Sequence, residues 1–213
     1  LFTLHFLIYY SCFFKHPKFC AYLIKLSLIK SKIENKNKKN KKTIIVLERV
    51  IGGRRDIEII QKSTNQSFEI LFMRRSITKI ILTYFCFKGK FFFNYHKPKP
   101  SNQDYLNQKK NERDGHEQFW TDVIYYLKKY FKNNHLSFVT FAYYYHAEKA
   151  LFVGCKNNKI PVKLWHKECF MSDEDVRSRV KMNEFKDVFK YFYKISVYNN
   201  MMKKMLISMD KSN

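Results

Sequence analysis

Short apolar segments alternate with longer amphipathic stretches from residue 43 onward, and this alternation is the main structural signal of the chain. The first of them, TIIVLE at residues 43–48, is β-branched and continuous, as in a strand buried on both faces. The stretches between them repeat their apolar residues at helical spacing, most clearly over residues 116–132. The predicted strands span residues 43–48, 68–73, 136–141, 160–165 and 193–198.

Strands that alternate with helices are joined by right-handed crossovers and form a parallel sheet. We therefore predict an α/β fold, a three-layer Rossmann-like domain with a mostly parallel sheet over residues 43–208. Residues 76–87 are long enough for a buried helix, although their pattern also fits a strand. Residues 88–113 are polar and predict an exposed excursion. The other predicted helices span residues 54–62, 116–132, 147–157 and 199–208, with one more beginning at Ser172.

The N-terminus differs in character from this domain. Residues 1–29 are mostly apolar, residues 30–42 form a Lys- and Asn-rich linker, and residues 209–213 form a tail. The first apolar run is shorter than the roughly 20 residues of a membrane-spanning helix, and its basic residues follow it, unlike those of a signal peptide. Three interpretations stay open: an apolar and basic interfacial helix, a helix packed on the domain, or upstream sequence without a role.

Composition narrows the class of protein. The 213 residues carry a formal net charge of +23, and 18% of them are aromatic. This apolar content excludes wholesale disorder, and five glycines are too few and too scattered for a glycine-rich phosphate loop. Such charge attracts anionic membranes or nucleic acids, or reflects a lysine-rich coding bias. The five cysteines include no C-x-x-C pair, which predicts no zinc site and a reducing compartment.

Polar side chains follow each predicted strand, at the edge where open parallel sheets bind ligands. His166 with Glu168, or His146 with Glu148, could supply a general base and the carboxylate that orients it. The alternative is that these histidines are packed or capping residues. We predict catalytic roles for His166, Glu168 and His146, and no metal or cofactor. The residues predicted to bind ligand are Arg49, Arg54, Arg55, Tyr145, Glu148, Lys167 and Asn199.

Five short motifs carry a resemblance to a known family. They are IVLER at 45–49, RDIEI at 55–59, FAYYYHAE at 141–148, IPVKLWHKE at 160–168 and KISVYN at 194–199. Together they resemble the N-terminal domain of glycosyltransferase-B-like proteins of bacterial surface-carbohydrate biosynthesis. The match covers residues 43–208, and the lysine-rich segment before them is no part of it.

The resemblance implies two Rossmann-like domains around a cleft, with the acceptor held by the first. It implies that this chain is the acceptor half of a glycosyltransferase, incomplete and inactive alone. Its partner would be a saccharide or a lipid-linked saccharide, met in the cytoplasm at the inner membrane, where residues 1–42 would contact anionic lipid. Two alternatives stay open: a basic nucleic-acid-binding protein and a non-catalytic membrane-surface protein.

Overall fold

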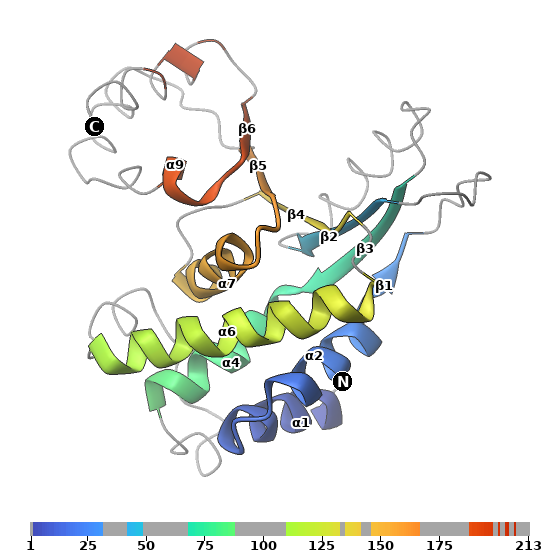
Figure 1. The fold of residues 1–213 in the computed structure, drawn as a ribbon, viewed down its shortest axis with the longest axis vertical. Helices are drawn as coiled ribbons and strands as arrows, with labels where there is room; N and C mark the ends of the chain where they lie inside the picture. The colour runs from blue at the N-terminus through green and yellow to red at the C-terminus, as the bar shows by residue number, and fades with distance from the viewer. Residues whose placement is uncertain are drawn as a thin grey trace.

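A computed structural model describes residues 2–31, 42–48, 68–87, 110–132, 135–141, 146–166, 188–197, 200, 203–204 and 207. Over these residues the chain is an α/β domain built on a six-stranded, mostly parallel sheet (Figure 1). In chain order its elements are α1 (Phe2–Phe13), α2 (Pro17–Ser27), β1 (Ile29–Lys30), β2 (Lys42–Glu48), β3 (Phe68–Arg74), α4 (Arg75–Phe87), α6 (Lys110–Tyr130), β4 (Ser137–Thr140), α7 (His146–Asn157), β5 (Val162–His166), α9 (Val188–Tyr191) and β6 (Lys194–Val197).

The strand order across the sheet is β1-β3-β2-β4-β5-β6. β2 pairs in parallel with both β3 and β4, so that Ile45 lies between Leu71 and Phe138. β5 and β6 continue the parallel series, whereas β1 pairs antiparallel with β3 at the edge. All five predicted strands are confirmed, and so is their parallel arrangement. The two-residue β1 was not predicted.

The two faces of the sheet carry separate clusters of buried side chains. On one face, β2, β3 and β4 contribute Ile45, Met73 and Phe138 to the main core, and the described helices α1, α2, α4, α6 and α7 pack there. Figure 1 shows these helices on one side of the sheet. On the other face, Val46 and Phe72 belong to a second cluster. The helices predicted over residues 54–62 and from Ser172 lie outside the described residues, so the three-layer arrangement stays a prediction.

Where the structure describes them, the predicted helices between the strands are confirmed with shifted ends. Residues 76–87, which could have been a helix or a strand, lie in the helix α4. α6 begins at Lys110 rather than near residue 116. The prediction of an exposed, non-helical excursion over residues 88–113 is therefore wrong for its last four residues. Glu112 and Arg113 are good helix formers, and Glu112 complements the positive helix start. Of the helix predicted over residues 199–208, only Asn200, Lys203, Lys204 and Ile207 are described, and these are helical.

The N-terminal segment packs into the main core, and the structure does not confirm it as a separate extension. It forms two helices rather than one, because Lys15 takes a positive φ of 51° after α1 and Pro17 begins α2. Ile8, Cys12, Cys20 and Ile24 are fully buried in the same cluster as the sheet residues. No helix among the described residues combines the length and the apolar character that crossing a membrane requires.

Candidate site at the carboxyl edge of the sheet

The five parallel strands end at one edge of the sheet, and the strand order reverses there. From β2 the chain passes to β3 on one side and later to β4 on the other. In open parallel sheets this reversal leaves a crevice beyond the carboxyl ends, where ligands bind. The crevice would lie between the ends of β2 and β4, at Glu48 and Thr140. This edge is therefore the candidate site.

The structure brings two of the predicted catalytic residues to this edge. His166 is the last residue of β5, and His146 is the first residue of α7, directly after the segment that follows β4. Because β4 and β5 are neighbours, both histidines lie at the carboxyl end of the same strand pair. Seven of the predicted site residues lie outside the described residues: Arg49, Arg54, Arg55, Tyr145, Lys167, Glu168 and Asn199.

Glu148, which we predicted to bind ligand, takes part in an internal ion pair. Its Oε1 lies 3.1 Å from Nε of Arg75, and only 4% of the Glu148 side chain is exposed. The other carboxylate oxygen, Oε2, accepts a hydrogen bond from Oγ1 of Thr140 at 3.3 Å. Three elements, α4, β4 and α7, are thereby fixed to one another beneath the edge. Through these contacts Glu148 stabilises the packing of the three elements at the edge.

A second polar contact at this edge joins the N-terminal segment to the domain. Nε2 of His5, in α1, lies 3.0 Å from Oγ of Ser76 in the first turn of α4. Burial lowers the pKa of His5, and the positive charges of the N-terminus and of Arg74 lower it further. At neutral pH the imidazole is therefore neutral, and it can donate a hydrogen bond to the Ser76 hydroxyl or accept one from it.

Sequence reasoning missed most of this arrangement. Arg75 was visible as a polar residue after the second strand, and its position at the end of a buried run is the signal that could have marked it. Thr140 looks like part of a buried strand, and His5 lies inside the apolar N-terminal run. Neither carries a local signal, because their partners come from distant elements.

Two kinds of reactive group can be checked among the described residues, metal-binding clusters and cysteine thiols, whereas Cys169, which follows β5, lies outside them. Within the described ranges, no three His, Cys, Asp or Glu side chains come close enough to hold a metal ion. Burial raises the pKa values of the Cys12 and Cys155 thiols well above their usual range, which keeps both in the unreactive thiol form. His146, the first residue of α7, and His166, the last residue of β5, stay the predicted bases.

A hollow of about 780 Å³ lies at the opposite, amino edge of the sheet, lined among others by Ser137 and Val162 at the starts of β4 and β5. It belongs to a different surface from the predicted residues.

Comparison of the chain with protein-family models, with curated proteins and with solved structures finds no match.

Proposed function

We propose that this chain is the acceptor-binding domain of a glycosyltransferase of surface-polysaccharide biosynthesis, with a three-layer Rossmann-like fold. The observation that carries the proposal is the reversal of strand order between β2 and β4, with His146 at the start of α7, the helix that follows β4, and His166 at the end of β5. Folds of this class host many functions, so the argument rests on the residue types at the edge and on the motif resemblance.

In the proposed chemistry, His146 or His166 acts as the general base on the acceptor saccharide. A neutral imidazole takes the proton from a saccharide hydroxyl while the hydroxyl oxygen forms a bond to the anomeric carbon of the donor sugar. The bond from that carbon to the donor's leaving group breaks in the same displacement, and the leaving group departs with the electron pair. The ion pair of half-buried Arg75 with buried Glu148 joins α4 to α7, which keeps the edge in a fixed geometry.

Calorimetric titration with neutral saccharides tests this proposal without interference from the charge of the protein. The panel contains glucose, galactose, mannose, N-acetylglucosamine, N-acetylmannosamine and their disaccharides. We expect at least one to bind, and the double variant His146→Ala/His166→Ala to weaken that binding at least about tenfold, the effect of about 1.4 kcal/mol. Lys156→Ala, at the opposite edge, serves as the control and should bind as the original chain does. An absence of binding across the panel contradicts the proposal.

A specific observation also favours the membrane-surface association expected of residues 1–42. The faces of α1 and α2 that point away from the core expose large apolar side chains, and Lys15, Lys18 and Lys25 lie among them. No acidic residue occurs before Glu34. Aromatic rings with surrounding lysines are typical of helices that lie at the surface of an anionic bilayer. The exposed apolar residues are Phe6, Leu7, Phe13, Phe14, Phe19, Tyr22 and Leu26.

We therefore propose a cytoplasmic domain that is peripheral to the inner membrane through α1 and α2. Co-sedimentation with vesicles containing phosphatidylserine should be strong, and it should weaken in vesicles of phosphatidylcholine alone. The triple variant Phe13→Ser/Phe14→Ser/Leu26→Ser should lose most of the binding, because these side chains are more than half exposed. The exposed ring of Tyr125 on α6 provides the control, as Tyr125→Ser. Equal binding by all variants overturns this part of the proposal.

A further inference from the structure

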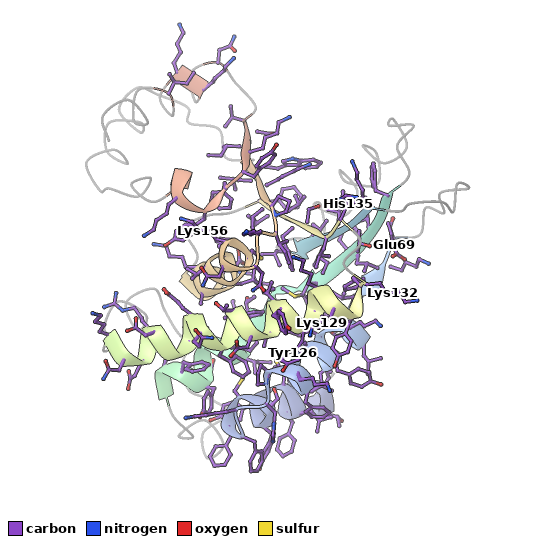
Figure 2. All side chains as sticks on the ribbon, in the orientation of Figure 1. Glu69, Tyr126, Lys129, Lys132, His135 and Lys156 are labelled. Atoms are coloured by element: carbon purple, nitrogen blue, oxygen red, sulfur yellow. The ribbon has the colours of Figure 1, made fainter. Side chains whose placement is uncertain are left out.

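The hollow at the amino edge of the sheet is strongly basic. Its volume is about 780 Å³, within the range of ligand sites, and none of the described side chains that line it is acidic. The lysines come from β2, α6, α7, the turn after α7, β5 and α9, so the folded arrangement rather than one sequence run brings them together. Figure 2 labels Lys156 of α7 and His135, which precedes β4. The six lysines that line the hollow are Lys42, Lys128, Lys156, Lys159, Lys163 and Lys190.

Structural roles account for only a small part of this charge. α6 and α7 both end at this edge, and each helix C-terminus carries about half a negative charge. Nζ of Lys128 donates a hydrogen bond to the carbonyl oxygen of Asn158, 3.2 Å away, just beyond α7. Glu69, at the amino end of the nearby strand β3, pairs with Lys30 at 3.4 Å. Two half-charges balance about one lysine. Glu117 of α6 also interacts electrostatically with Lys190. Among the described residues, most of the positive charge of the six lysines therefore remains.

A concave surface of one charge concentrates its field and attracts anions of the opposite sign. A flat bilayer cannot enter such a hollow, whereas a flexible chain of phosphates can follow its lysines. Tyr193, at one side of the hollow, exposes 79% of its surface. An exposed ring beside a basic groove is the arrangement on which single-stranded nucleic acids stack their bases. We propose that this hollow binds single-stranded nucleic acid, with its phosphates at the lysines and a base on Tyr193.

The site is independent of the carboxyl edge, so its test does not depend on saccharide binding. Fluorescence anisotropy with a labelled twelve-nucleotide oligothymidine, over a series of sodium chloride concentrations, measures it in the full chain. If all six lysines contact phosphate, the logarithm of the binding constant should fall against the logarithm of salt concentration with a slope of about −4.

Two triple variants with equal charge changes separate the hollow from the general charge of the protein. Lys156→Gln/Lys159→Gln/Lys163→Gln should reduce the magnitude of the slope by about 2. The matched control Lys15→Gln/Lys18→Gln/Lys25→Gln lies on the N-terminal helices and the turn between them, and should leave the slope unchanged. The two triple variants are also matched in backbone conformation, because each contains one lysine with a positive φ: Lys15 at 51° and Lys159 at 55°. Circular dichroism melts establish that each variant is folded.

Tyr193→Ala should weaken oligothymidine binding by about tenfold without changing the salt slope, because a ring contributes stacking and no charge. Three results would overturn the proposal. One is an equal loss of slope in both triple variants, which indicates attraction to the net charge alone. Another is unchanged affinity in Tyr193→Ala. The third is binding of phosphatidylserine vesicles that depends on the lysines of the hollow, which assigns them to a membrane instead.

Discussion

At the scale of single residues, burial decides which charged groups shape the domain. Arg75 and Glu148 form an ion pair whose side chains are 17% and 4% exposed. Removing one partner takes the opposite charge away from a largely buried group, so we expect Arg75→Met or Glu148→Met alone to lower the free energy of unfolding, by up to about 3–5 kcal/mol. The double variant Arg75→Met/Glu148→Met should recover much of that loss, because it buries no charge. Urea denaturation measures all three, and additive losses in the double variant would argue against a coupled pair.

His116 is the second residue for which burial governs behaviour. Its ring is fully buried and stacks on Phe85, with 4.9 Å between ring centroids. Desolvation lowers the pKa of the imidazole to about 3, whereas the unfolded chain has a value of about 6.5. Between these values the unfolded chain binds more protons, so stability falls as the pH is lowered through this window.

We expect His116 to contribute a loss of about 1.4 kcal/mol in the free energy of unfolding per pH unit on acidification below about pH 6. Urea denaturation at pH values from 7 to 4.5 measures the slope. His116→Leu removes the titrating group and should flatten the slope by that amount, whatever its effect on stability at pH 7. An unchanged slope in the variant would show that His116 has the same pKa in the folded and the unfolded chain.

At the scale of elements, the contact between α6 and α7 depends on a glycine. A Cβ atom added at Gly154 would lie 2.8 Å from the carbonyl oxygen of Trp120, closer than real contacts allow. Because this neighbour is helix backbone, it cannot move aside. Gly115, in α6, lacks this constraint, since its nearest neighbour would be Cε1 of Phe85 at 3.8 Å.

These two glycines give a matched pair of variants. We expect Gly154→Ala to lower the free energy of unfolding by about 1–3 kcal/mol, because α6 and α7 must separate. Gly115→Ala should raise it by about 0.5–1 kcal/mol, because alanine restricts the unfolded chain and favours the helix. Thermal and urea unfolding of both variants measure the difference. A stabilising Gly154→Ala would contradict the close packing of the two helices.

The elements were predictable from sequence to the extent that their signal is local. β2 and β3 each contain an uninterrupted apolar run, at residues 44–47 and 70–73, and the parallel arrangement follows from the alternation of strands with helices. β1 escapes prediction because two residues carry no periodicity, and its pairing with β3 depends on the tertiary fold. For the site, the strand order alone places His146 and His166 at one edge. The contact of Arg75 with Glu148 spans two helices and is decided by packing.

At the scale of the whole molecule, three surfaces with different chemistry are held by one core. The carboxyl edge of the sheet carries His146 and His166, the amino edge carries the basic hollow, and α1 and α2 carry exposed aromatic side chains. Figure 1 shows α1 and α2 beyond α6, on the side away from the sheet. Because the same helices bury Ile8 and Ile24 in the main core, their outer surface is fixed relative to the sheet.

The most direct test of the account is to map where a neutral saccharide binds. Amide chemical shifts of the isotope-labelled chain, followed during titration with N-acetylglucosamine disaccharide, report the surface that is contacted. If the carboxyl edge is the acceptor site, the amides of Arg74, Thr140, His146 and His166 should shift, while those of Ser137, Lys156 and Lys163 at the amino edge stay in place. Shifts confined to the amino edge, or no shifts at either edge, would contradict the assignment.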